Sequence, residues 1–234
     1  ITNLVECVGR AHLSVEAMVP SAIASGAGTL IEDERDNGAI CIDMGAGVTA
    51  VSAFLHGAPA WLDLVRSGGA HVTSDLAQGL GTTFAAAERL KTVYGTADQD
   101  GPSLAERIEC PVLGDDGRLN ATRLPKSRLA EIIAPRVEET FEIVRARMDA
   151  SAVGNVLPRR AVLTGGASQL SGVREVASRV LGMPVRLGRP RAADSLGEVL
   201  AAPCFSTASG LLTYELAGRS DVMQAGHGYR PGGE

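Results

Sequence analysis

The sequence predicts an α/β fold with an aliphatic core. Three strand-like segments (39–43, 48–54 and 60–65) are joined by short turns, which is typical of an antiparallel meander and not of the βαβ opening of a Rossmann fold. Residues 160–182 then follow the pattern strand, glycine turn, helix. Apolar residues make up 45% of the chain and aromatic residues only 3%, so Val, Leu, Ile and Ala must form the core. At 234 residues, the chain can bury this core in one large domain or two small ones.

The first part of the chain adds further elements around the meander. Residues 21–27 are nearly all small, which predicts a helix packed closely against a neighbour. The charged stretch 31–38 is typical of a solvated turn. After the meander, a glycine break precedes a short helix within 67–80. A second helix is expected over 84–94, with a threonine cap before it and a glycine stop after it.

The later part of the chain predicts a hairpin and a long helix. The hairpin is expected where "GDDG" separates the strand-like segments "RIECPVL" and "LNATRL". The helix is expected over 127–148, and Pro135 within it predicts a kink or a late start. Its apolar residues repeat at helical spacing: Leu129, Ile133, Val137, Phe141, Val144 and Met148. A short strand at "VRLG" and a helix over 206–218 complete the pattern.

Charge and composition exclude several classes of function. The net charge of −5 offers no basic surface to a nucleic-acid backbone, and the few aromatic residues argue against base stacking, so no nucleic-acid partner is expected. Four cysteines lie far apart without paired spacing, which indicates free thiols in a reducing compartment. No apolar run approaches the ~20 residues of a membrane-spanning helix. The chain starts at Ile1, and we expect an internal fragment or a processed chain.

Two glycine turns are the candidates for a ligand site. Gly45 and Gly47 follow the first strand of the meander, and Gly165 and Gly166 follow the strand near residue 160. Neither turn has the G-x-G-x-x-G pattern of dinucleotide-binding folds or the G-x-x-x-x-G-K-[ST] pattern of a P-loop. Taken singly, a double glycine between a strand and a helix is more often a packing or turn device than a binding site.

Taken together, the two turns indicate a site for a nucleotide with its metal ion. Backbone amides of the first turn can wrap phosphate oxygens, with Asp43 facing Mg²⁺ through water and Thr49 returning a hydroxyl. The second turn lacks side-chain bulk, so a flat heterocycle can lie against its backbone. From the other side, Glu88 and Lys91 can hold ribose hydroxyls, because they lie one turn apart on the 84–94 helix. The alternative for these two residues is a solvated ion pair.

The order of the motifs resembles the actin-like ATPase superfamily. "DMGAGVT" is similar to its second phosphate motif and "VLTGGAS" to its adenosine motif. "SAIASGAG" and "FSTASGLL" are similar to its two connecting helices. Two longer segments, "GGAHVTSDLAQGLGTTFAAAERLK" and "LAEIIAPRVEE", resemble the FtsA family of bacterial cell-division proteins. The resemblance covers nearly the whole chain, and its implications below are expectations.

The resemblance implies an actin-like (ribonuclease H-like) subdomain 2A with an inserted subdomain 2B. By this resemblance, subdomain 2A comprises residues 31–81 and 157–216, and subdomain 2B comprises residues 82–156. Residues 1–30 would be a remnant of domain 1 with the first connecting helix, and 217–234 a flexible tail. The other half of the family's fold, which carries its first phosphate hairpin, is expected to be absent. The family's C-terminal amphipathic membrane helix has no counterpart in "DVMQAGHGYRPGGE".

The resemblance also implies a function. FtsA proteins bind ATP, self-associate into filaments and link the FtsZ ring to the membrane, so a cytoplasmic protein is expected, peripheral on the inner membrane at the division site. The matching motifs add Ala46, Ala167 and Ser168 to the nucleotide-binding residues. Many superfamily ATPases position the attacking water with a Glu or Gln, but "MVPSAIASG" has neither, and Ala50 stands where a polar residue is frequent. We therefore expect slow ATP turnover at most, no activity from this chain alone, and ATP acting as a conformational ligand.

Two other functions are compatible with the same fold and motifs. Sugar and acetate kinases share the fold and similar phosphate loops, and a fold does not fix a function. Such a phosphotransferase would need an acid that positions its substrate near the phosphates, and the recognised motifs contain no candidate. The second alternative is an actin homologue of pilus assembly, a binding module that does not engage FtsZ.

A second stripe on the 127–148 helix predicts a partner site. It consists of Ile132, Arg136, Thr140, Ile143 and Arg147. A solvated face would lack the two isoleucines, and a core face would lack the two arginines. An apolar row with positive ends suits a docked peptide with acidic and apolar residues, and the FtsZ C-terminal tail, which binds subdomain 2B in the family, is such a peptide. The alternative is that the isoleucines pack under the neighbouring hairpin while the arginines extend along the surface.

Overall fold

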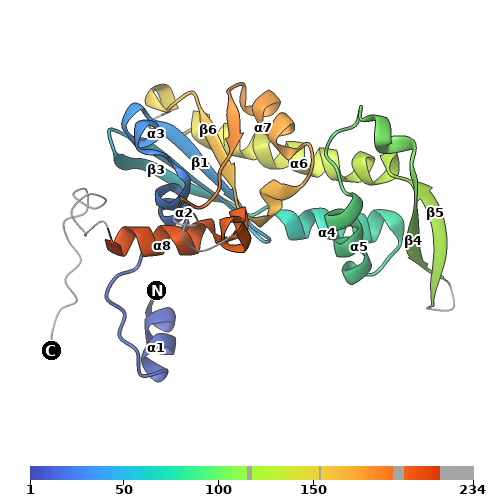
Figure 1. The fold of residues 1–234 in the computed structure, drawn as a ribbon, viewed down its shortest axis with the longest axis horizontal. Helices are drawn as coiled ribbons and strands as arrows, with labels where there is room; N and C mark the ends of the chain where they lie inside the picture. The colour runs from blue at the N-terminus through green and yellow to red at the C-terminus, as the bar shows by residue number, and fades with distance from the viewer. Residues whose placement is uncertain (115–117, 153, 192–197, 217–234) are drawn as a thin grey trace.

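A five-stranded mixed sheet organises the part of the chain that the structure describes (Figure 1). The computed structural model describes residues 1–114, 118–152, 154–191 and 198–216. The strand order is β3-β2-β1-β6-β7. The strands are β1 (Ala39–Met44), β2 (Thr49–Leu55), β3 (Ala58–Val65), β6 (Ala161–Thr164) and β7 (Val185–Leu187). Strands β1 to β3 form the predicted antiparallel meander, and β6 runs parallel to β1 on its other side.

Helices cover both faces of this sheet. The alternation along β1 assigns the two faces: Ala39 and Cys41 pack with Ile23 of α2 (Ser21–Thr29), while Ile40 and Ile42 belong to the larger core on the opposite face. Helix α8 (Ser206–Leu216) packs against α2, and α6 (Ser127–Asp149) and α7 (Val173–Leu181) lie on the opposite face. The predicted close packing of the segment 21–27 is therefore confirmed.

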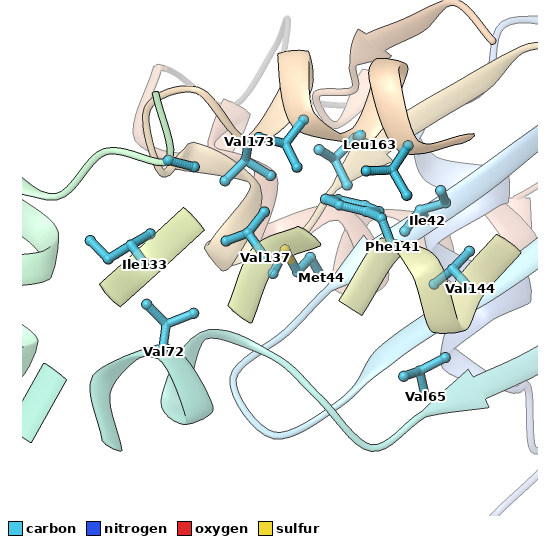
Figure 2. Packing of buried hydrophobic residues seen from close by; sticks show 14 of the residues in the cluster. Ile42, Met44, Val65, Val72, Ile133, Val137, Phe141, Val144, Leu163 and Val173 are labelled. Carbon is cyan, nitrogen blue, oxygen red and sulfur yellow. The ribbon is translucent and has the colours of Figure 1, made fainter. Parts of the chain in front are cut away.

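The long helix α6 connects the sheet to a second group of elements. Figure 2 shows Phe141 and Val144 of α6 near Ile42, and Ile133 of the same helix near Val72. Every residue of the predicted apolar stripe is buried. At the end of α6 far from the sheet lie α4 (Gly69–Leu80), α5 (Phe84–Tyr94) and the hairpin of β4 (Arg107–Leu113) and β5 (Leu119–Pro125) (Figure 1). One continuous core joins the two groups, and the boundaries of subdomains 2A and 2B stay a prediction.

The remaining elements are short or peripheral. Helix α1 (Thr2–Arg10) has no buried residue and lies apart from the sheet in Figure 1. The 3₁₀ turns are η1 (Pro102–Ala105), η2 (Gly154–Val156), η3 (Gly166–Gln169), η5 (Glu198–Ala201) and η6 (Pro203–Phe205). All four cysteines are free, as predicted. Among the described residues, no helix is both long and apolar enough to cross a membrane.

One local prediction was wrong, and of the two outcomes predicted for Pro135 the late start does not occur. The stretch 31–38 is not a solvated turn but contains the helix α3 (Glu32–Asn37), whose Glu34 is 6% exposed. Burial raises the pKa of the Glu34 carboxyl, but hydrogen bonds from Arg186 and the Ile31 amide outweigh it and lower the pKa overall. Pro135 does not delay α6, which begins at Ser127; the proline is exposed, so water can reach the carbonyl that it leaves without a partner.

Candidate functional site

The first glycine turn is docked onto the start of helix α4. The Gly45 amide donates to the Val48 carbonyl at 2.9 Å, which closes the turn between β1 and β2. The Gly45 and Ala46 carbonyls accept from the amides of Gly69 and Ala70 at 2.9 and 2.8 Å. These contacts leave no room for a side chain at Gly68, where a Cβ would lie 2.5 Å from the Gly45 oxygen. The sequence predicted Gly68 and Gly69 only as a glycine break before a helix. It did not indicate that they support the first glycine turn.

The sheet brings the second glycine turn to the same place. Asp43 and Thr164 are partners in the parallel pair of β1 and β6, so the loops after both strands leave the same edge of the sheet. Gly165 has φ +87°, and a Cβ there would lie 2.5 Å from the Met44 oxygen and even closer to the Asp43 carboxylate. Ser168 is buried and donates to the Gly165 carbonyl at 2.7 Å, which closes the second turn.

A cavity of about 740 Å³ lies between the two turns and helix α5. Six of the predicted nucleotide-binding residues line it: Gly45, Ala46, Glu88, Lys91, Gly166 and Ala167. Phe84, Val93 and Gln169 also line it, and sequence reasoning missed them. The helical spacing of Phe84, Glu88 and Lys91 was a usable signal for Phe84, because residues four and seven apart share one face.

Glu88 and Lys91 form a partly buried network that faces the cavity. The Lys91 Nζ lies 2.7 Å from Glu88 Oε2, and it also donates to the Gly69 carbonyl at 3.0 Å and to Thr73 Oγ1 at 2.8 Å. The Lys91 side chain is 13% exposed and that of Glu88 is 45% exposed, so the pair is half-buried and not fully solvated. Burial raises the pKa of Glu88, but hydrogen bonds from Lys91 and Thr73 lower it overall and keep the carboxylate ionised near neutral pH.

The other predicted residues lie near the cavity without lining it. Asp43 accepts a hydrogen bond at 2.9 Å from Thr207 of α8, and burial raises the pKa of its carboxyl. Thr49 is fully buried and donates to the Ser67 carbonyl at 2.8 Å, so its hydroxyl is not turned toward a phosphate. Gly47 is exposed in the first turn. Gly165 and Ser168 are buried within the second turn and do not face the cavity.

The donor set fits one class of metal ion. Within the described ranges, no group of three or more His, Cys, Asp or Glu side chains is placed to hold a metal. Mg²⁺ could still be held there, because it keeps several waters and is commonly bound by substrate phosphates and one or two carboxylates. Asp43 is the carboxylate predicted for this role.

The stripe on α6 is largely engaged in contacts within the chain, and only part of it is open to the predicted peptide. Arg136 makes a two-pronged ion pair with Asp75 of α4, at 2.5 and 3.2 Å. Thr140 is buried, and its hydroxyl lies 2.7 Å from Ser67 Oγ. Ile132 packs close to Gly79 of α4.

The C-terminal end of the stripe also contacts other parts of the chain. Ile143 packs against the core, and Arg147 lies 3.3 Å from Asp63 of β3. Helix α4 and strand β3 therefore contact the row on which a peptide is expected to dock, while the Arg147 side chain stays 55% exposed. The docking site on this row stays a prediction.

Comparisons with known proteins agree with the expected family. The family model described as cell division protein FtsA matches residues 40–210. The cell division protein FtsA of Rhizobium meliloti is 43% identical over 97% of this chain and 52% of its own length. That of Agrobacterium fabrum is 44% identical over 92% of this chain and 48% of its own length. The chain thus spans about half the length of the curated relatives that it matches.

A solved structure shows the fold. The structure of MreB5 of Spiroplasma citri bound to ADP superposes with a TM-score of 0.73, at 12% identity, over 92% of this chain and 65% of that one. At this identity the likeness concerns the fold alone, and it confirms the predicted actin-like α/β architecture.

Proposed function

Because this chain belongs to the FtsA family of cell-division proteins, we propose that it is the nucleotide-binding half of an actin-like protein that binds ATP with Mg²⁺. The observation that carries the nucleotide part is the cavity itself. Two glycine turns, more than a hundred residues apart in the chain, meet at its edge with a partly buried Lys91 and Glu88. An anionic ligand with hydroxyl groups and a flat ring would complement these surfaces.

Each part of the cavity suits one part of ATP. Gly166 and Ala167 form a wall with little side-chain bulk, against which the adenine ring can lie. Glu88 can accept from the ribose hydroxyls, and Lys91 can donate to them. The backbone of Gly45 and Ala46 borders the phosphate side. Asp43, which accepts a hydrogen bond from Thr207, would help to hold Mg²⁺ through its water shell, and the ion would supply positive charge beside the phosphates.

The wider cellular role rests on family membership. We propose that the complete protein polymerises, binds the C-terminal tail of FtsZ and links the FtsZ ring to the cytoplasmic face of the inner membrane at the division site. The membrane contact would come from the amphipathic C-terminal helix that is typical of the family. The α6 stripe could contribute to binding of the FtsZ tail only through its exposed residues, such as Arg147. The match to the FtsA family over residues 40–210 favours this function over a sugar-kinase-like phosphotransferase or a pilus-assembly protein.

Calorimetric titration of the chain with ATP, with and without Mg²⁺, tests the nucleotide site. We expect Lys91→Met to weaken ATP binding about tenfold, because it removes charge-assisted bonds at the cavity wall. Lys126→Met is the matched control: Lys126 is 18% exposed and pairs with Glu106 at 2.6 Å, but it does not line the cavity. Equal affinities of the two variants, or no ATP binding by the parent chain, would contradict the proposal.

The same titration separates the metal from the nucleotide. We expect Asp43→Asn, which can still accept from Thr207, to lose the Mg²⁺-dependent part of the affinity and to keep the part measured without metal. An equal loss under both conditions would show that Asp43 acts on the structure of the loops and not on the metal ion.

A further inference from the structure

We propose that Thr73 is a positioning residue of the nucleotide site, and that its hydroxyl holds Glu88 and Lys91 in the geometry that recognises ribose hydroxyls. Thr73 does not line the cavity, and nothing in its immediate sequence marks it as functional. The inference rests on the proposed ATP-binding function and extends it to a residue behind the cavity wall.

The hydroxyl of Thr73 lies at the centre of a polar network. Thr73 belongs to α4 and is fully buried. Its Oγ1 accepts from Lys91 Nζ at 2.8 Å and contacts both Glu88 Oε2 and the Gly69 carbonyl, the latter at 3.0 Å. A hydroxyl has one proton, so it donates to one of these two oxygens at a time. Both charged side chains of the α5 pair thus meet one fixed point on the neighbouring helix.

This fixed point matters because lysine and glutamate side chains are flexible. Holding each of them in one rotamer costs conformational entropy, which the ligand would otherwise have to offset on binding. Threonine suits the task because its branched Cβ restricts the side chain to few rotamers. A threonine within a helix often bonds only to the carbonyl four residues earlier, here Gly69. The contacts to Lys91 and Glu88 go beyond that local pattern.

The network also reaches the phosphate side of the cavity. The Gly69 carbonyl accepts from Lys91, while the Gly69 amide donates to the Gly45 carbonyl in the first glycine turn. The residue pair proposed to bind ribose and the first glycine turn are therefore both hydrogen-bonded to the first turn of α4. Loss of the Thr73 hydroxyl should loosen Glu88 and Lys91, which would keep only their mutual contact and the bond from Lys91 to the Gly69 carbonyl. The glycine turn would keep its own backbone bonds.

The experiment compares the binding of ATP with that of 2′,3′-dideoxy-ATP, which lacks both ribose hydroxyls. In the parent chain we expect ATP to bind about tenfold more tightly than the dideoxy compound, as hydrogen bonds to charged groups predict. Thr73→Val keeps the shape but removes the hydroxyl, and should reduce this ratio to about twofold. Thr73→Ser keeps the hydroxyl and should retain most of the ratio.

Thr140→Val serves as the matched control, because Thr140 is also a buried helical threonine with a side-chain partner, Ser67, but it lies outside the cavity. It should leave the ratio unchanged even if it lowers stability. If the parent discriminates between the two nucleotides and Thr73→Val discriminates equally well, the inference is overturned while the ATP site stands. If the parent binds neither nucleotide, the proposed function fails first, and the inference with it. Should Thr73→Val not fold, Thr73→Ala carries the same comparison.

Discussion

Glycines have different structural roles in the helix pair α2–α8 and in the glycine turns at the cavity. In the helix pair they remove atoms so that two backbones can touch. A Cβ on Gly28 would lie 2.5 Å from the Ser206 carbonyl oxygen, and a Cβ on Gly210 would overlap the Ala24 carbonyl. In the turns, among the residues that the structure describes, a Cβ on Gly166 would meet only Cys204, at 3.6 Å, and a Cβ on Gly47 would meet nothing within 4 Å.

The difference shows that a glycine-rich motif has two physical meanings. Between α2 and α8, the glycines are required for folding, because any side chain at these positions would push the two close-packed helices apart. At Gly166, which lines the cavity, the missing side chain leaves space in which a ligand could lie. Gly165 combines both: it belongs to a cavity turn but is packed against β1. Substitutions to alanine therefore separate stability from binding.

Gly210→Ala should have the largest effect on stability. The new methyl group would overlap the Ala24 carbonyl and force α8 away from α2. Alanine favours a helix by ~1 kcal/mol over glycine, but overpacking of this kind costs more, so we expect a net loss of about 2–3 kcal/mol in the free energy of unfolding. Urea unfolding monitored by circular dichroism measures it. An unchanged midpoint would mean that the helix pair tolerates a wider spacing.

Gly165→Ala should have an intermediate effect on stability together with a loss of binding. Its φ of +87° disfavours any residue with a side chain, and the added methyl would press on Met44 and Asp43. We expect a loss of about 1–2 kcal/mol in unfolding free energy, and weaker Mg-ATP binding because Asp43 moves. Wild-type affinity in a destabilised variant would show that the position of Asp43 is not tied to this turn.

Gly166→Ala should change binding without changing stability. There is room for the methyl group beside Cys204, so the unfolding free energy should stay within about 0.5 kcal/mol of the parent value. The methyl would, however, enter the wall proposed for adenine, and ATP affinity should fall about tenfold, or ~1.4 kcal/mol. Titration calorimetry at matched Mg²⁺ checks this. An affinity equal to that of the parent would move the adenine site to another wall of the cavity.

Gly47→Ala should have the smallest effect on stability. The residue is exposed, has no positive φ, and would gain a methyl group with no neighbour within 4 Å. We expect a change of at most about 0.5 kcal/mol in the free energy of unfolding. A loss comparable to that of Gly210→Ala would show that the first turn is packed more tightly than its contacts indicate, and would remove the distinction between the two regions.

Local patterns in the sequence determined the elements and the glycine turns. The strand-like segments 39–43 and 48–54 with their short turn, the helical spacing from Leu129 to Met148 and the threonine cap of α5 are signals carried by neighbouring residues. The structure confirms each of them. The two glycine turns were also recognisable, because a strand followed by glycines has few other uses. Their meeting at one cavity was inferred, and the parallel pairing of β1 with β6 brings it about.

Tertiary structure alone decided which surface covers each face. Glu34 belongs to a charged segment, yet Arg186 from the far end of the chain makes its burial possible. The row from Ile132 to Arg147 has mixed character because α4 and β3 supply both apolar contacts and acids, Asp75 and Asp63. Thr73 gains its partners only when α5 packs beside α4. A periodic pattern shows that a face is buried, but the identity of its cover depends on contacts between residues far apart in the chain, which local spacing does not encode.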